Sequence, residues 1–352
     1  MSVSQRDFRS QRALRLASGV ALCLALSFGL NLPMPFIAPL LCATLLSALT
    51  KPLPLKAGLG LTLVMMLITG SGLLLIPLLR YYALSGVLVI GLCLFATFRF
   101  GLRGGNPLLA TFMVVGLTMI SAAGATDFGL ALMVIEALTK GLLLALLALT
   151  ISHWLFPEPS NSPQPPAKPL LPANEASWVA LRAALVVLPA YLLALINPAS
   201  YMPIIMQAVN LGQQSCTTNA RDAGRLMLGS TLLGGMLAML FWSALGLFVN
   251  LWMFYLWMLL FGLVLARQLF AVSPSQYGPP FWLNSLTTMI ILLGQSVQDS
   301  NNGKDVYTAF AVRMSLFIGV TLYACLMVHV LDQHRQRRSQ RPQPNPENLD
   351  AA

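Results

Sequence analysis

The segment GLGLTLVMMLITGSGLLLIPLL, at residues 58–79, contains no charged side chain. An apolar helix of about 20 residues crosses the roughly 30 Å hydrocarbon layer of a membrane. The rest of the chain has the same character, since 57% of its 352 residues are hydrophobic and only 9% are charged. A water-soluble domain needs about 25% charged residues to cover its surface. The sequence therefore predicts a membrane protein with several spans and excludes a soluble enzyme.

Spans of similar character recur along the whole chain. We expect an all-α polytopic protein with about 12 transmembrane helices. The predicted spans are residues 14–31, 36–50, 58–79, 81–98, 107–124, 130–155, 180–197, 202–215, 226–248, 250–270, 280–298 and 307–331. Residues 157–176 are rich in proline, which favours an extended, solvated linker. Residues 332–352 are basic and polar, and we expect a disordered tail.

The two halves of the chain resemble each other at an offset of roughly 164–176 residues. The segment from Asn31 to Pro39 resembles the one from Asn197 to Pro203, and Arg99 corresponds to Arg267. We therefore predict two parallel six-helix repeats, residues 1–156 and 177–331, related by an axis along the membrane normal.

The basic residues predict the orientation. All lysines and arginines fall on one side of the predicted membrane except Arg80, Lys304, Lys140 and Arg313. Such a bias places both termini and the linker in the cytoplasm. The apolar stretch after Arg15 lacks a small-x-small cleavage site, so we interpret it as a retained first span.

Two short predicted spans at corresponding positions are interrupted by proline. They are residues 36–50, preceded by Pro33 and Pro35 and containing Pro39, and residues 202–215, preceded by Pro198 and containing Pro203. Such a matched pair is the best sequence indicator of a transporter binding site. The alternative is a tilted or re-entrant helix that only packs.

Polar residues form stripes on two predicted spans. Residues spaced three, four or seven apart share one helical face. The stripes are Gln207, Asn210, Gln214 and Thr217, and Asn284, Thr288, Gln295 and Gln298. Amides would be costly against lipid, so both stripes should face the protein interior. Two interpretations stay open, namely a solute path and interhelical hydrogen bonds that only hold the bundle together.

Three charged residues fall inside predicted spans: Glu136, Lys140 and Arg313. A charge near the bilayer centre costs about 2.5–3.5 kcal/mol on insertion scales and normally has a partner or a wet cavity. We expect Arg313 to receive a solute carboxylate, because its planar guanidinium forms two parallel hydrogen bonds. Glu136 or Asp127 would then exchange protons. The alternatives are a Glu136–Lys140 pair along one helix and a structural Arg313–Glu136 pair.

Other classes of site lack a signal in the sequence. No CxxC or Cys/His spacing predicts a metal site or a disulfide framework, and no catalytic set of Ser, His and Asp stands on a polar loop. The bases lie between apolar runs and not along a polar face, so no nucleic-acid partner is expected. We predict no enzyme activity and no cofactor. His153 and His329, at the ends of matching spans, are interpreted as interfacial caps.

The chain resembles the fusaric acid resistance / aromatic acid exporter superfamily. The resemblance rests on Tyr201-Met202-Pro203, Gln213-Gln214 and Gly224-Arg225-Leu226-Met227-Leu228-Gly229, and the segment from Leu32 to Leu41 looks like a short, uncharacterised branch. The family's large cytoplasmic domains are replaced here by the Pro-rich linker. The resemblance implies proton-driven efflux of aromatic or other weak organic acids across the inner membrane. It also implies a periplasmic membrane fusion protein as partner.

Three functions follow as hypotheses. The first is secondary active, proton-coupled export of small organic anions from the cell. The second is a passive organic-anion channel, and the third is a non-transporting membrane scaffold of an envelope or secretion complex. The sequence leaves open the identity of the solute and whether the chain is a monomer or a homo-oligomer in the bilayer.

Overall fold

The computed structural model describes residues 3–49, 51, 53–157, 171–216, 222 and 224–339. These residues form helices joined by short turns, and none of them is in a β-strand. The predicted all-α class is therefore confirmed for the described part of the chain.

The first half contains a helix or a run of helices for each of its six predicted spans. These are α1 (Val3–Gly29), α2 (Ile37–Ala48), α3 (Leu55–Gly70) with η1 (Ser71–Leu75) and α4 (Ile76–Tyr81), α5 (Ala83–Leu102), α6 (Pro107–Val115) with η2 (Gly116–Ile120) and α7 (Ser121–Thr126), and α8 (Phe128–Leu155). The third and fifth spans are therefore continuous paths made of several helical segments.

The second half follows the same order. It contains α9 (Ala173–Ile196), α10 (Pro198–Ser215), η3 (Gly224–Leu228) with α12 (Gly229–Leu245), α13 (Leu251–Leu269), α14 (Pro279–Asn301) and α15 (Val306–Ser339). Asn197 accepts a hydrogen bond from the Ser200 amide and caps α10, whose first residue is Pro198. Proline suits this position because the first amides of a helix have no intrahelical partner.

Nine helical stretches in the described residues are long and apolar enough to cross a membrane. Such helices indicate a multi-pass membrane protein. The other three predicted spans are α2, which has only 12 residues, and α10 and α14, which carry the polar stripes. These three lie inside the bundle, and every residue of α14 from Asn284 to Gly294 is buried. A helix surrounded by protein needs no apolar surface toward lipid.

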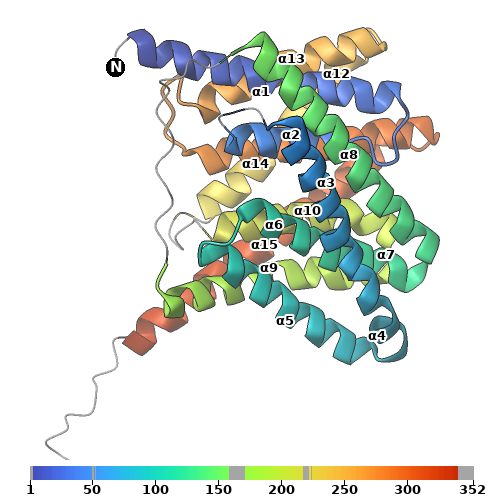
Figure 1. Cartoon of the computed structure of the whole chain (residues 1–352), viewed down its shortest axis with the longest axis vertical. Coiled ribbons are helices and arrows are strands. Elements are labelled where there is room, and N and C mark those ends of the chain that lie inside the picture. Colours follow the sequence, from blue (N-terminus) through green and yellow to red (C-terminus); the bar gives the residue numbers. More distant parts are fainter. Residues whose placement is uncertain are drawn as a thin grey trace, which may run out of the picture.

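The two halves of the chain interlock. The first helix of the first half, α1, packs along α13 of the second, and α9 of the second half packs along α5 of the first. Figure 1 shows α1 and α13 together at the top of the molecule and α5 and α9 together at the bottom. The first helix of each half therefore packs against a helix of the other half.

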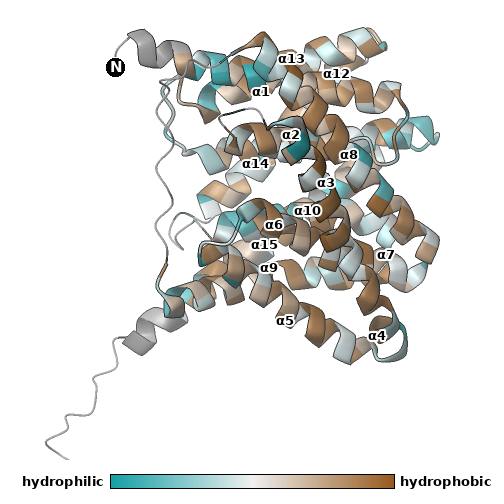
Figure 2. Ribbon diagram, in the orientation of Figure 1, coloured by the Kyte–Doolittle hydropathy of each residue, from teal (hydrophilic) through white to brown (hydrophobic). Residues whose placement is uncertain are grey.

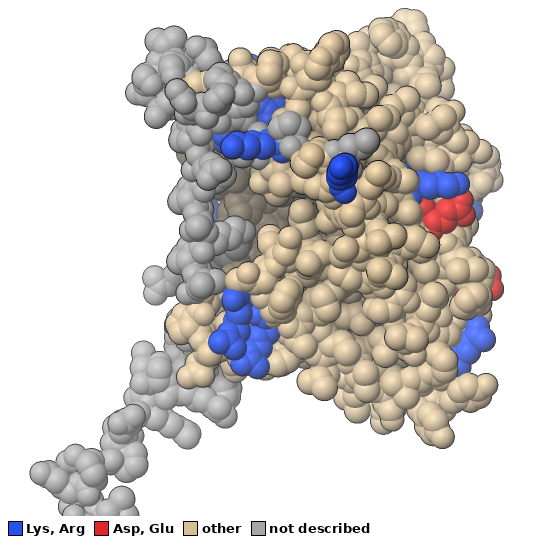
Figure 3. All heavy atoms as spheres, in the orientation of Figure 1, with Lys and Arg blue, Asp and Glu red and all other residues tan. Residues whose placement is uncertain are grey.

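Figure 1 also shows that α1 and α9 begin, and α15 ends, on the same side of the molecule. The long helices carry hydrophobic residues along most of their length (Figure 2). The face in Figure 3 consists mostly of residues other than Lys, Arg, Asp and Glu, and the basic and acidic side chains stand in a few small groups. Such a surface suits an apolar surrounding.

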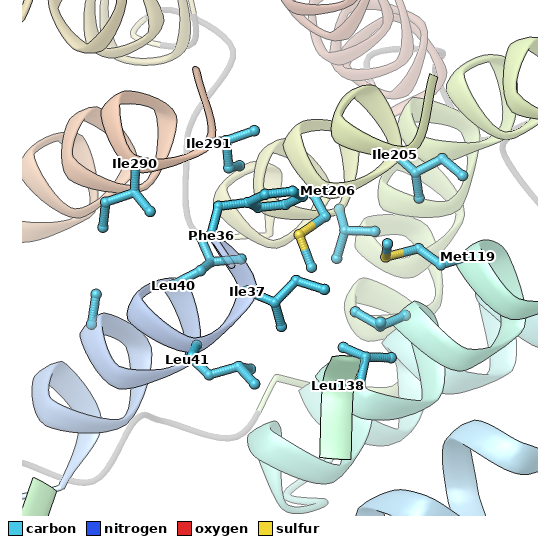
Figure 4. Packing of buried hydrophobic residues seen from close by; sticks show 14 of the residues in the cluster. Phe36, Ile37, Leu40, Leu41, Met119, Leu138, Ile205, Met206, Ile290 and Ile291 are labelled. Carbon is cyan, nitrogen blue, oxygen red and sulfur yellow. The ribbon is translucent and has the colours of Figure 1, made fainter. Parts of the chain in front are cut away.

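The centre of the bundle is apolar and closely packed. Phe36 and Ile37, at the start of α2, meet Met206 of α10 and Ile291 of α14, and all four side chains are buried (Figure 4). A methyl group on Gly294 would lie 2.4 Å from Cβ of Phe36, so α14 approaches this point only because residue 294 is glycine. The innermost helices thus meet through hydrophobic contacts.

Two predicted boundaries differ from the structure. The predicted linker ends at residue 176, but α9 begins at Ala173, directly after Pro172. The predicted tail starts at residue 332, but α15 continues to Ser339. Its 34 residues reach about 51 Å at 1.5 Å each, which exceeds the membrane, so its polar end continues as a helix beyond the apolar layer. The rest of the predicted linker, 158–170, and of the tail, 340–352, lies outside the described residues.

Candidate functional site

A line of polar side chains runs along the buried face of α14. It consists of Asn284, Thr288, Gln295 and Asp299, which are spaced four and seven residues apart and so share one face. From Asn284 to Asp299 the line extends about 22 Å along the helix axis. Asn284, Thr288 and Asp299 are buried and Gln295 is half-buried.

The middle of this line belongs to a hydrogen-bonded network between four helices. Thr288 donates to Oε1 of Gln207 on α10 at 3.2 Å, and Nε2 of Gln207 donates to the hydroxyl of Thr231 on α12 at 3.3 Å. The hydroxyls of Thr231 and Thr321, on α15, lie 3.3 Å apart. All four side chains are fully buried. The sequence predicted that Gln207 and Thr288 face inward but not that they bond each other.

Asn284 extends the network toward the start of α14. Its Nδ2 donates to the hydroxyl of Ser230 on α12 at 2.8 Å. Its Oδ1 is buried and has no hydrogen-bond partner in the described part of the chain, and the same is true of Nδ2 of Asn210 on α10. A buried polar atom without a partner costs about 1–3 kcal/mol. Both amides therefore retain hydrogen-bonding capacity for a further group.

A single position allows α12 to approach this network. A methyl group on Gly234 would lie 2.7 Å from Cβ of Thr288 and 2.7 Å from the carbonyl oxygen of Ser285. Contacts under 3.0 Å do not occur for real Cβ atoms. Glycine at residue 234 is therefore required for the spacing of α12 and α14.

The last turns of α14 carry an ion pair. Nη1 of Arg313 on α15 donates to Oδ2 of Asp299, and these side chains are 16% and 5% exposed. One turn earlier, Nε2 of Gln295 donates to Oε1 of Gln298 at 3.2 Å. The sequence placed Arg313 inside the membrane but did not indicate Asp299 as its partner, because the two residues lie on different helices and the turn between α14 and α15 brings them together.

A second ion pair lies near the opposite end of α15. Nη1 of Arg182 on α9 donates to both carboxylate oxygens of Asp332, at 3.0 and 2.8 Å, and Nη2 donates to the carbonyl oxygen of Ser215 at the end of α10. Sequence reasoning counted Arg182 and Arg15 only as cytoplasmic charges. In the structure both are buried. Arg15 and Arg182 occupy corresponding positions in the two halves, and this correspondence is the sequence signal that could have distinguished them from the other arginines.

The end of α10 contains the remaining amides of the predicted stripe. Gln214 is buried next to Ser215, whereas Asn210 is half-buried. Between them, Gln213 donates from Nε2 to the hydroxyl of Thr111 on α6 at 2.9 Å, which links the two halves. Thr217, the last member of the predicted stripe, lies outside the described residues.

The structure does not bring the two proposed proton-exchanging residues to this site. Glu136 accepts a hydrogen bond from Nζ of Lys140 at 2.5 Å, and both side chains are 51% exposed on the surface of α8. Asp127 is exposed and caps α8 by accepting from the Gly129 amide at 3.0 Å. The Glu136–Lys140 pair was one of the predicted alternatives. The predicted alternative of an Arg313–Glu136 pair is not what the structure shows, since Arg313 pairs with Asp299 and Glu136 pairs with Lys140.

The two histidines differ in burial. His153 is buried, and its Nδ1 lies 2.8 Å from the carbonyl oxygen of Leu149 one turn earlier. His329 is exposed. Among the described residues, no group of three His, Cys, Asp or Glu side chains is arranged to hold a metal ion.

Comparison with known proteins gives one match. Residues 12–151 match the model of a family described as "Protein of unknown function (DUF2955)". The match covers α2 to α7 and most of α1 and α8, and less than half of the chain. No curated protein and no solved structure matches the chain. The match therefore concerns the first half alone and carries no named activity.

Proposed function

We propose that the protein is a transporter that exports small organic acids, aromatic or other weak acids, across the inner membrane. The observation that carries the proposal is the buried polar line of α14, with Asn284 at one end and Asp299 at the other. Polar side chains inside a membrane bundle are expensive, and they mark solute and ion pathways when they face the interior. Here the line stands on α14, whose residues from Asn284 to Gly294 are all buried.

The ion pair at the end of this line suits an anionic solute. Arg313 can exchange Asp299 for a solute carboxylate, since its guanidinium binds either in the same geometry. A solute carboxylate from the cytoplasm takes the place of Asp299 on Arg313, and Asp299 takes up a proton from the other side only after the solute has left. Solute and proton are then carried in opposite directions by one site, as export driven by proton entry requires, and Asp299 replaces Glu136 and Asp127 as the proton-exchanging residue.

We further propose that the chain consists of two parallel six-helix repeats. The reciprocal packing of α1 on α13 and of α9 on α5 supports this arrangement, since a two-fold axis exchanges the two contacts. The glycine crossings support it as well. Gly72 of η1 approaches η2 as closely as Gly234 of α12 approaches α14. The buried Arg15 and Arg182 stand at the repeat spacing.

The apolar packing at the centre favours a pump over an open channel. Phe36, Met206 and Ile291 fill the space where α2, α10 and α14 meet (Figure 4). Exchange between two closed states, with a solute site near the repeat interface, is the general scheme for repeat-built transporters. A bacterial inner membrane with both termini inside, and a periplasmic partner, belong to the same proposal.

The proposal is tested by transport in everted membrane vesicles with a panel of aromatic acids, such as benzoate. We expect uptake that a protonophore abolishes. Uptake and current that persist with the protonophore would favour the channel. No uptake of any acid above that of vesicles lacking the protein would favour the scaffold and overturn the proposal.

A further inference from the structure

An open hollow of about 670 Å³ lies beside the last turn of α5 and the turn that follows it. Its apolar wall includes Leu92, Phe95 and Phe100, and its polar end includes Arg99 and Arg103. A methyl group on Gly105 would lie 2.6 Å from the backbone carbonyl oxygen of Phe100, so the turn has this shape only because residue 105 is glycine. This site is separate from the polar line of α14.

The two arginines of the hollow have no protein partner in the described part of the chain. No ion pair or side-chain hydrogen bond involves Arg99 or Arg103. The contrast is with Arg80, whose guanidinium donates to the carbonyl oxygens of Gly124 and Ala125 at 3.2 and 3.3 Å. Arg99 and Arg103 are four residues apart, at the end of α5, so both side chains are available on the same side.

The apolar wall faces outward. Leu92 is 66% and Phe100 46% exposed, and α5 is one of the stretches long and apolar enough to span a membrane. Arg99 and Arg103 stand at the end of that stretch, which is the depth of the lipid headgroups. The amide of Gly105 is already bonded to the carbonyl of Phe100 at 3.0 Å, so the two side chains supply the charge of the site.

We propose that this hollow binds an anionic phospholipid. Arg99 and Arg103 bind the headgroup phosphate, and an acyl chain lies along Leu92 and Phe95. Basic pockets at the ends of spans recognise lipid headgroups in this way. A lipid is favoured over a free anion because the wall of the hollow is continuous with the lipid-facing surface of α5, which a free anion leaves uncovered. The inference does not depend on the proposed transport activity.

The experiment is native mass spectrometry of the full chain in detergent, titrated with phosphatidylglycerol. The variant R99Q/R103Q is compared with wild type. We expect its affinity for the first lipid to fall about thirtyfold, which corresponds to about 1 kcal/mol for each arginine. The charge-preserving variant R99K/R103K should retain most of the binding. A matched control, K51Q/R267Q, removes two exposed basic residues elsewhere and should bind as wild type does.

Two further measurements distinguish binding of the whole lipid from binding of its headgroup alone. L92N leaves both charges in place and should still weaken phosphatidylglycerol binding several-fold. Glycerol 3-phosphate should not displace the bound lipid at equal concentration. Wild-type affinity in R99Q/R103Q, or equal loss in K51Q/R267Q, would overturn the proposal. Displacement by glycerol 3-phosphate would also overturn it, because the site would then recognise a free anion. Thermal unfolding of each variant checks that it is folded.

Discussion

At the scale of single residues, buried charged side chains connect helices of this protein. Arg182, a residue of α9, is buried against the end of α10 and Asp332 of α15. A buried ion pair contributes little net stability, but removal of one partner leaves the other without compensation. The pair therefore ties three helices together and makes each partner sensitive to substitution.

We expect Arg182→Gln to destabilise the protein by about 3 kcal/mol, because Asp332 and the Ser215 carbonyl both lose their donor. Thermal unfolding in detergent measures the effect. Arg225→Gln is the matched control, since Arg225 is exposed, and it should leave the midpoint within about 1 °C. Equal unfolding midpoints for the two variants would show that the Arg182–Asp332 pair does not stabilise the protein.

A second prediction at this scale concerns pH. Asp305, just before α15, accepts hydrogen bonds from the Thr308 hydroxyl and from the amides of Tyr307 and Thr308, and these bonds lower the pKa of its carboxyl group. A lowered pKa in the folded state stabilises the helix start above the ordinary pKa, and the effect is lost as pH falls through the folded value. Hydrogen exchange at the Tyr307 and Thr308 amides measures this.

We expect the protection of these two amides, relative to their intrinsic rates, to fall at low pH. In Asp305→Ala, protection should be low already at neutral pH and should no longer change with acidification. Pronounced pH dependence in Asp305→Ala would assign the titration to another group.

At the scale of elements, close helix crossings depend on glycine. We expect Gly234→Val to separate α12 from α14 and to cost about 1–3 kcal/mol, since overpacking forces backbone shifts. Gly319→Ala is the control, because a methyl group there meets no atom within 4 Å. That substitution should be neutral or stabilising, as alanine is the better helix former. A neutral Gly234→Val, measured by thermal unfolding, would contradict the described packing.

The sequence predicted the elements well because membrane spans have a strong, long signal. All twelve predicted spans have a helical counterpart, although only nine of the helical stretches in the described residues qualify as spans by length and apolarity. The polar stripes correctly predicted buried faces for Gln207, Asn284 and Thr288. The partners of the buried arginines were harder to predict from the sequence. The Arg313–Asp299 and Arg182–Asp332 pairs each join two helices, and a single sequence does not specify which helices meet. The exposure of Glu136 on α8 could not be predicted for a related reason: hydropathy indicates depth in the membrane but not which side of a helix faces the protein.

At the scale of the whole molecule, the interlocked halves predict that neither half folds alone. Residues 1–156 lack α13, against which α1 packs, and residues 157–352 lack α5, against which α9 packs. We expect each half to be degraded when expressed singly and both to accumulate when co-expressed. Detection of tagged halves in membranes measures this. Stable accumulation of either half alone would mean that the cross-packing is dispensable.

The central claim is that the buried acid beside Arg313 couples proton and solute movement, whereas the exposed acid of α8 does not. The direct measurement is benzoate uptake by everted vesicles that contain Asp299→Asn or Glu136→Gln at matched protein levels. Both variants replace one carboxylate by an amide of the same shape. We predict a loss of about a hundredfold or more in the rate for Asp299→Asn, the size expected of a lost proton-transfer group, and a wild-type rate for Glu136→Gln. Equal rates in the two variants, or loss only in Glu136→Gln, would contradict the account.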